Sequence, residues 1–142
     1  KCLGKEITQI IALPRTKETL LVEDLMTRHI HTVGPEASIR AAISLLNRYR
    51  VSSIVVVEND KPIGILTYRN ILQQIGKKRI VDLRLTKVKT LMSTPLVEIS
   101  PKASLEEALT VMRNKHVKKL PVISNGKLIG IITSNDILRL RQ

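Results

Sequence analysis

The sequence contains two copies of one pattern at a spacing of 66 residues. Residues 22–72 align without a gap on residues 88–138, and the turn positions stay in register, so that Gly64 falls on Gly130. A repeat that keeps its turns in register indicates one structural unit used twice. Each unit is too small to bury its own apolar face well, so we expect the two to pack together around a pseudo-twofold axis.

Both repeats show the same order of elements. A short helical turn precedes a brief extended stretch, and Ser38 and Ser104 then stand at the expected starts of two amphipathic helices. Asn125-Gly126 predicts a tight hairpin between strands, with Asn59-Asp60 as its equivalent. Second helices are expected from about Arg69 and Asn135. The expected strands cover residues 30–33, 53–57, 63–67, 96–99, 120–123 and 128–133.

This order predicts a mixed α/β (α+β) fold of two pseudo-twofold-related β-α-β-β-α repeats, packed sheet to sheet. The expected organisation has four parts. They are an N-terminal arm or remnant of another domain (1–21), a first repeat (22–76), a basic linker (77–87) and a second repeat (88–142). Function is expected in the cleft between the repeats.

The amino-acid composition limits the classes of molecule that the chain is expected to bind. The chain has no Phe or Trp and two Tyr, so a bound ring would meet aliphatic walls and backbone, not a stacking platform for single-stranded nucleic acid. Its net charge of +12 favours anionic partners. One cysteine permits no internal disulfide, and no apolar run reaches the roughly 20 residues of a membrane span. We therefore expect a cytoplasmic protein without a membrane partner.

Catalytic patterns do not occur. The histidines His29, His31 and His116 have no nearby cysteine, no serine lies on a nucleophile elbow, and no glycine-rich phosphate loop is present. His29 and His31 alone are too few for a metal site. The sequence predicts neither an enzyme nor a metal centre, and no required cofactor.

The junction Thr133–Asp136 carries two interpretations. A hydroxyl and a carboxylate three residues apart at a helix start can form a capping box, which satisfies free backbone amides. The same carboxylate can accept the two hydroxyls of a ribose while the threonine faces a phosphate, because a helix start also favours anions. From the residues alone, capping is the favoured interpretation, and both can hold together.

The two repeats resemble a pair of CBS domains, the tandem arrangement called a Bateman module. The likeness covers residues 22–140 and rests on motifs that occur in register. These are Leu-Met-Thr and Leu-Met-Ser, Pro-x-Ala-Ser, His-Val-Lys-Lys-Leu-Pro-Val at 116–122 and Gly-Ile-Ile-Thr-Ser-Asn-Asp at 130–136. The resemblance implies a regulatory module that binds AMP, ADP, ATP or S-adenosylmethionine in the cleft between repeats. It also implies a homodimer.

The resemblance implies one main site. Asp136 would bind the ribose, Thr133 would lie near the phosphate, Ile131 would flank the adenosine, and Lys118 and Lys119 would meet phosphates as point charges. The opposite repeat would enclose the adenine. The residues expected there are Thr27, Arg28, His29, Ile30, His31 and Val51.

The symmetric site departs from the family pattern. Asn70 stands where the carboxylate is expected, and Ser52 and Ser53 replace the two lysines. Asparagine accepts a hydrogen bond but lacks the charge that strengthens it. We therefore expect this second site to be weak or empty. Its other expected members are Thr67, Ile65, Val117 and Val97.

Two other functions remain open. The basic surface could bind nucleic acid, which steep salt dependence would reveal. The module could also be a ligand-free structural unit for dimerisation, or be read by a partner protein.

Overall fold

The computed structural model describes residues 19–77 and 82–141. Each repeat contributes a helix, a β-hairpin and a second helix, in the predicted order. In the first repeat these are α3 (Ile39–Tyr49), β2 (Ser53–Glu58), β3 (Lys61–Thr67) and α4 (Tyr68–Gly76). In the second they are α6 (Leu105–Lys115), β4 (Lys119–Ser124), β5 (Lys127–Thr133) and α7 (Ser134–Leu138), followed by a 3-10 turn (Arg139–Arg141).

The helix starts and hairpin turns lie where the sequence predicts them. Ser38 Oγ accepts a hydrogen bond from the amide of Ala41 at 3.0 Å, and Ser104 Oγ accepts one from Glu107 at 3.1 Å. These N-caps confirm the predicted starts of α3 and α6. Asn125 and Gly126 have φ angles of 53° and 77°, and Asn59 and Asp60 are also left-handed. Both turns are therefore of the expected tight kind.

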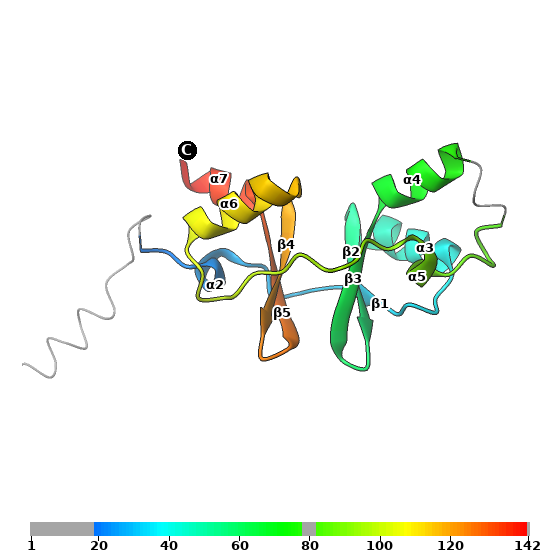
Figure 1. The fold of residues 1–142 in the computed structure, drawn as a ribbon, viewed down its shortest axis with the longest axis horizontal. Helices are drawn as coiled ribbons and strands as arrows, with labels where there is room; N and C mark the ends of the chain where they lie inside the picture. The colour runs from blue at the N-terminus through cyan, green and yellow to red at the C-terminus, as the bar shows by residue number, and fades with distance from the viewer. Residues whose placement is uncertain (1–18, 78–81, 142) are drawn as a thin grey trace, which may run out of the picture.

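Two small sheets lie at the centre of the molecule. In one, β1 (Thr32–Val33) pairs parallel with β2, which pairs antiparallel with β3; in the other, β4 pairs antiparallel with β5. Figure 1 shows the two hairpins side by side with the helices outside them, and β3 contacts β5. The stretch expected over 96–99 differs: it forms only a single parallel bridge, Ile99 to Val122.

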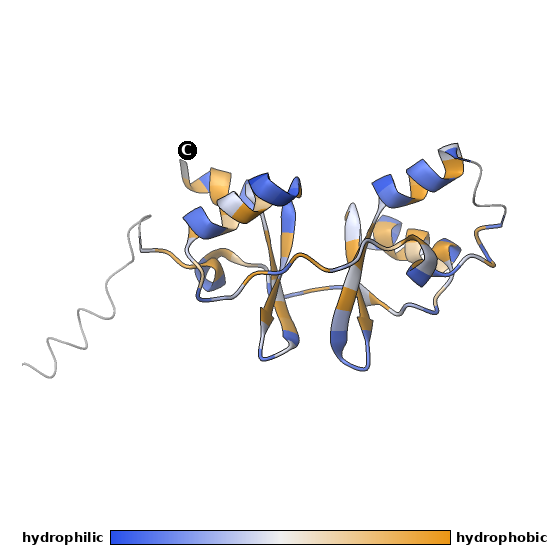
Figure 2. Cartoon of the chain, viewed as in Figure 1, coloured by the Kyte–Doolittle hydropathy of each residue, from blue (hydrophilic) through white to orange (hydrophobic). Residues whose placement is uncertain are grey.

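The apolar faces of these elements form two cores. In α3 the buried residues are Ile39, Ala42 and Leu46, which lie on one helix face. Figure 2 shows hydrophobic stretches along the strands and a hydrophilic turn at the tip of each hairpin. No helix in the described ranges is long and apolar enough to cross a membrane.

The short helical turns are exchanged between the repeats. The turn α2 (Val22–Leu25) opens the first repeat but lies on the second, where the Val22 amide donates to Ala103 O at 2.9 Å. The turn α5 (Val88–Leu91) lies on the first repeat, where the Val88 amide donates to Ala37 O at 2.8 Å. Figure 1 shows both placements. Each hydrophobic core therefore contains residues from both sequence repeats.

The exchange explains why glycine recurs at one strand position. A Cβ at Gly64 would stand 2.9 Å from Met92 Sδ and 2.9 Å from the carbonyl oxygen of Ser93. A Cβ at Gly130 would stand 2.6 Å from Met26 Sδ and 3.1 Å from Thr27 O. In both places the segment after the exchanged turn approaches the strand so closely that a side chain has no room.

An ion pair joins each exchanged turn to the repeat on which it lies, and the acidic and basic partners are reversed between the two pairs. Glu23 on α2 pairs with Lys102 of the second repeat at 3.0 Å, whereas Lys89 on α5 pairs with Glu36 of the first at 2.8 Å. Lys87 adds a second contact to Glu36 at 2.7 Å. If a turn occupied the equivalent place on its own repeat, glutamate would face glutamate or lysine would face lysine. The charge reversal therefore favours the exchanged arrangement.

We expect the Lys102→Glu variant to lower the free energy of unfolding by up to about 1 kcal/mol, because it sets two carboxylates together at an exposed site. Adding Glu23→Lys restores an attractive pair of reversed polarity, and most of the stability should return. Urea unfolding of the two single variants and the double variant measures the coupling energy. Purely additive effects would show that the pair does not secure α2.

A candidate ligand cleft between the repeats

Both strand–helix junctions form capping boxes. The Thr133 hydroxyl accepts from the amide of Asp136 at 3.1 Å, and Asp136 Oδ2 accepts from the amide of Thr133 at 2.9 Å. Thr67 and Asn70 repeat both contacts at 3.0 Å. The capping interpretation is therefore confirmed at the main junction and at its symmetric copy.

The carboxylate of Asp136 keeps capacity for a ligand. Its Oδ1 accepts from Arg139 at 3.2 Å, and its side chain is 15% exposed. A carboxylate offers about four lone-pair positions, of which these contacts use two. Because Arg139 is largely exposed, its guanidinium can move aside without disturbing the core. The chemistry needed to accept two ribose hydroxyls is present.

The side chain of Asn70 has less hydrogen-bonding capacity left for a ligand than that of Asp136. Its Oδ1 caps the helix, and its Nδ2 donates to Ser93 Oγ at 3.2 Å. Ser93 belongs to the segment that follows the exchanged α5, so the amide of Asn70 ties the two sequence repeats together. It does not line the cavity described below.

The residues of the loop expected to enclose the adenine lie in three different surroundings. Thr27 exchanges backbone hydrogen bonds with Ile131 at 2.8 and 2.9 Å, which sets this loop beside the Asp136 junction. The ring of His31 stacks on Tyr49 with centroids 3.4 Å apart, and His29 meets His31 edge-on at 4.9 Å. Arg28 and Ile30 instead line a hollow of about 490 Å³ near the hairpin turns, with Asp60 and Lys127.

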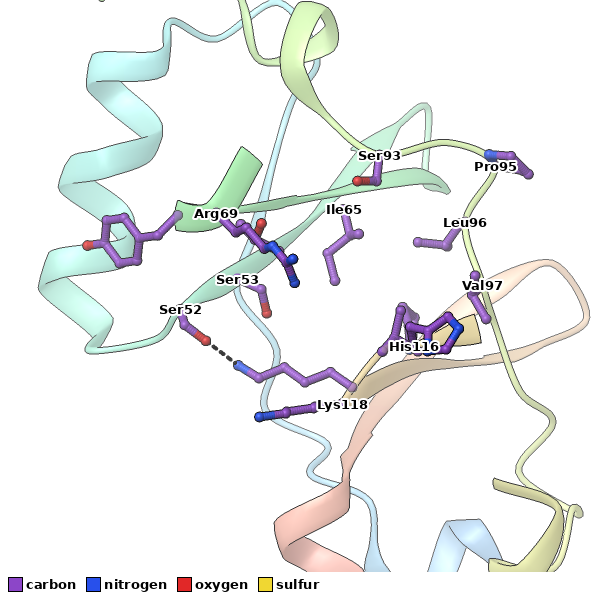
Figure 3. Close-up of a pocket in the computed structure, with 15 residues that line it drawn as sticks. Ser52, Ser53, Ile65, Arg69, Ser93, Pro95, Leu96, Val97, His116 and Lys118 are labelled. Atoms are coloured by element: carbon purple, nitrogen blue, oxygen red, sulfur yellow. Dashed lines mark hydrogen bonds between the residues drawn. The ribbon is translucent and has the colours of Figure 1, made fainter. Parts of the chain in front are cut away.

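A cavity of about 410 Å³ lies between the repeats on the Asn70 side (Figure 3). It brings together six of the seven residues expected at the symmetric site, and it also contains Lys118 and Lys119, which were expected at the Asp136 site. Its lining residues are Ser52, Ser53, Ile65, Thr67, Tyr68, Arg69, Ser93, Pro95, Leu96, Val97, His116, Val117, Lys118, Lys119 and Pro121.

The lining has one sign of charge. Arg69 enters from α4, while Lys118, Lys119 and His116 enter from the other repeat, and no aspartate or glutamate is among the lining residues. Figure 3 shows Arg69 and Lys118 extending from opposite repeats. The sequence alignment places only Ser52 and Ser53 at this position, but the start of β4 also borders the cavity, so that Lys118 and Lys119 contribute to its lining.

Lys119 lies between the two junctions. Its Nζ donates to Ser52 Oγ at 3.1 Å, the dashed contact in Figure 3. Burial lowers the pKa of the Lys119 ammonium, and the negative charge of Asp136 partly opposes that shift. The ammonium thus donates to a hydroxyl in the cavity and lies within range of the negative charge of Asp136.

Ser53 presents an unused hydroxyl. Its side chain is 9% exposed, and its Oγ is the one buried side-chain polar atom without a hydrogen-bond partner among the described residues. Figure 3 shows Ser53 directed into the cavity. A buried polar group without a partner is uncommon in folded proteins, and here it lies where a ligand could supply the partner.

Several lining residues were not expected from the sequence: Ser93, Pro95, Leu96, His116, Arg69, Tyr68 and Pro121. Ser93, Pro95 and Leu96 could have been predicted from the 66-residue spacing. They correspond to Thr27, His29 and Ile30 of the loop expected at the main site. No cluster of three or more potential metal ligands occurs within residues 19–77 and 82–141, which include His29 and His31.

Known proteins share both the sequence pattern and the fold. The CBS domain family matches residues 22–77 and 88–142. The CBS domain-containing protein YhcV of Bacillus subtilis is 36% identical over 117 residues, covering 82% of this chain and 81% of that protein. Inosine-5'-monophosphate dehydrogenase of Methanocaldococcus jannaschii is 32% identical over 142 residues, covering 99% of this chain but only 26% of the enzyme.

Solved structures agree with the fold. The CBS-domain containing protein ATU1752 from Agrobacterium tumefaciens superposes with a TM-score of 0.80 at 26% identity, covering 92% of this chain and 99% of that one. The CBS domain pair of MJ0100, crystallised with 5'-methylthioadenosine and S-adenosylmethionine, gives a TM-score of 0.78 at 21% identity, covering 87% and 96%. With its two matched repeats, their packed hairpins and the cavity between them, this chain belongs to the CBS domain family as a tandem pair, a Bateman module.

Proposed function

We propose that this CBS pair is a regulatory module that binds an adenosine-containing ligand, namely AMP, ADP, ATP or S-adenosylmethionine, in the cleft between its repeats. The observation that carries the proposal is the carboxylate of Asp136, which keeps acceptor capacity at a junction next to Lys119, and Lys119 in turn lines the cavity between the repeats. The MJ0100 pair, of the same fold, was crystallised with two adenosine compounds, which supports this class of ligand.

Asp136 is the residue that we expect to recognise the ribose. Its carboxylate accepts hydrogen bonds only, and charged acceptors form the stronger bonds to hydroxyl groups. Ile131 and Val51, the residues that the resemblance assigns to the adenosine, are aliphatic, so the adenine would be held by apolar contact and backbone groups. Lys118 and Lys119 supply positive charge for the phosphates.

Signalling would follow from the way the repeats are joined. A ligand in the cleft contacts both repeats, and it shifts their arrangement only if it binds one arrangement more tightly than another. The exchanged turns α2 and α5 pack into the cores of opposite repeats, so a change in the angle between repeats would be transmitted to both. We infer that the output is a change in conformation or in oligomeric state.

Thermal melting with each of the four ligands tests the proposal. A ligand at about 100 times its dissociation constant should add about 2.7 kcal/mol to the free energy of unfolding. Asp136→Ala should weaken binding at least about tenfold, because the ribose loses hydrogen bonds to a charged group. That variant also loses the helix cap, which costs about 1 kcal/mol without ligand, so the quantity to compare is the ligand-induced shift.

Asp136→Asn is the matched control. Asn70 already caps the symmetric helix with the same contacts, so asparagine at 136 should preserve stability while removing the charge. Its ligand-induced shift should fall close to that of Asp136→Ala. Absence of a shift with all four ligands would contradict the proposal. Steeply salt-dependent binding of nucleic acid would then favour the alternative based on the net charge of +12.

We also propose that the module is a homodimer. Leu72 on α4 and Leu138 on α7 occupy equivalent positions 66 residues apart, and they are 65% and 47% exposed. Ile75 adds a third exposed apolar side chain on α4. Figure 1 shows α4 and α7 on the same side of the molecule. A second copy related by a twofold axis could cover these side chains with their own counterparts.

A further inference from the structure

The two sides of the cleft differ in what they can recognise. We propose that the Asn70-side cavity is an anion site that binds the phosphate groups of a di- or triphosphate without requiring a ribose. This inference refines the proposed function, which it assumes only in placing the ligand between the repeats. It rests on three features: the positive charge of the lining, the presence of hydroxyl donors in it, and the hydrogen bonds that already engage the side chain of Asn70.

The charge of the wall favours a multiply charged anion. Arg69, Lys118 and Lys119 line one cavity of about 410 Å³ together with His116, and no carboxylate lines it. Such a concentration of like charge is unfavourable without a counterion. Lys119 in addition is partly removed from water, as its lowered pKa reflects. An anion in the cavity would offset both effects.

The hydroxyl groups of the wall are arranged as donors. Ser52 Oγ already accepts a hydrogen bond from Lys119, and Thr67 Oγ1 already accepts one from the backbone amide of Asn70. Each therefore keeps its own O–H proton free to donate. Ser53 Oγ has no hydrogen-bond partner within the part of the chain that the structure describes. A hydroxyl carries one donor, so these three groups offer three protons, and phosphate oxygens are acceptors.

Recognition of a ribose is not provided for on this side. The side-chain oxygen of Asn70 (Oδ1) caps α4, and its side-chain nitrogen (Nδ2) donates a hydrogen bond to Ser93 Oγ. At this position the ribose hydroxyls would meet a single acceptor oxygen, which already accepts from the backbone amide of Thr67, and no negative charge. Asp136, which offers a second oxygen and a negative charge, lies at the other junction. The cavity should accordingly bind inorganic polyphosphate with an affinity that the presence of a nucleoside does not determine.

Isothermal titration of pyrophosphate and tripolyphosphate, at constant ionic strength, tests the inference. We expect saturable binding at one site per chain. Lys119→Met should weaken it at least about tenfold and Ser53→Ala about three- to tenfold, because each removes a hydrogen bond to a charged group. Lys127→Met is the matched control: Lys127 lies at the separate hollow near the hairpin turns, so its loss should change affinity less than about twofold.

Urea unfolding separates binding from folding in these variants. Ser53→Ala removes a buried hydroxyl without a partner, so its urea midpoint should stay the same or rise. No saturable binding to the parent protein would overturn the inference. An equal loss in the Lys127→Met variant would also overturn it, because it would show that the net positive charge acts diffusely.

The results for the anion site and for the proposed function can be distinguished, although both involve Lys118 and Lys119. Adenosine ligands that require Asp136, combined with no binding of tripolyphosphate, would retain the proposed function and reject the anion site. Tripolyphosphate binding that depends on Lys119 and Ser53, combined with no response to any adenosine ligand, would do the reverse. In the Asp136→Asn variant, the anion site should bind tripolyphosphate at least as tightly, since a nearby negative charge is removed.

Discussion

Replacing Gly64 by alanine should lower the free energy of unfolding by about 2–3 kcal/mol, the upper range for overpacking a core. A Cβ at this position would stand 2.9 Å from the backbone oxygen of Ser93. That backbone cannot retreat freely, because Ser93 and Ile65 exchange hydrogen bonds at 2.8 and 3.3 Å. Relief of the clash would detach the segment that follows α5 from β3. Urea unfolding measures the loss, and the thermal midpoint should fall by several degrees.

Two other glycines calibrate this result. A Cβ at Gly34 would meet no atom within 4 Å, and the residue lacks a positive φ, so Gly34→Ala should be neutral or stabilising by up to about 1 kcal/mol. Gly130→Ala should cost less than Gly64→Ala, because its closest neighbour is the flexible thioether of Met26 and the backbone oxygen is 3.1 Å away. Equal stability of the Gly64→Ala and Gly34→Ala variants would contradict the close approach.

Local features of the fold were predictable because their causes are local. Ser38 and Ser104 cap helices by bonding to amides three residues onward, and Asn125-Gly126 forms its turn through the φ angles of those two residues. In each case the residues that determine the structure are adjacent in the sequence. The strands β2 and β4 were likewise predictable from continuous apolar runs.

The exchange of α2 and α5 was not predicted. A repeat in the sequence tells which segments are equivalent, but it does not tell which copy each segment covers. The deciding contacts join residues far apart, such as Val22 with Ala103 and Val88 with Ala37. One signal was available: residues 23 and 36 are both glutamate, and their equivalents 89 and 102 are both lysine, so attractive pairs form only across the repeats.

The site was affected in the same way. The sequence identified both junctions, Thr67–Asn70 and Thr133–Asp136, and six residues of the cavity, but it assigned the lysines by linear equivalence to one side. In the alignment Lys119 corresponds to Ser53 of the first repeat. In the structure its ammonium donates a hydrogen bond to Ser52, the residue next to Ser53. Residues near a pseudo-twofold axis can serve both sides, and a linear alignment cannot show this.

Combining Leu72→Asp with Leu138→Asp should convert the proposed homodimer to monomers. A leucine side chain that becomes fully buried contributes about 1.5–3 kcal/mol, and in a symmetric dimer each substitution acts twice. Loss of one such leucine per copy would therefore raise the dissociation constant by about 10²–10⁴-fold, and burying a carboxylate instead would raise it further. Sedimentation velocity over a range of concentrations measures the change.

Leu85→Asp is the matched control for this experiment. Leu85 is 79% exposed, but it lies in the segment before α5 and not on α4 or α7. The same substitution there should leave the dissociation constant unchanged. A monomeric parent protein would contradict the homodimer directly. A dimer that survives the double substitution would show that the two chains meet through another surface, and α4 and α7 would then be free for a different partner.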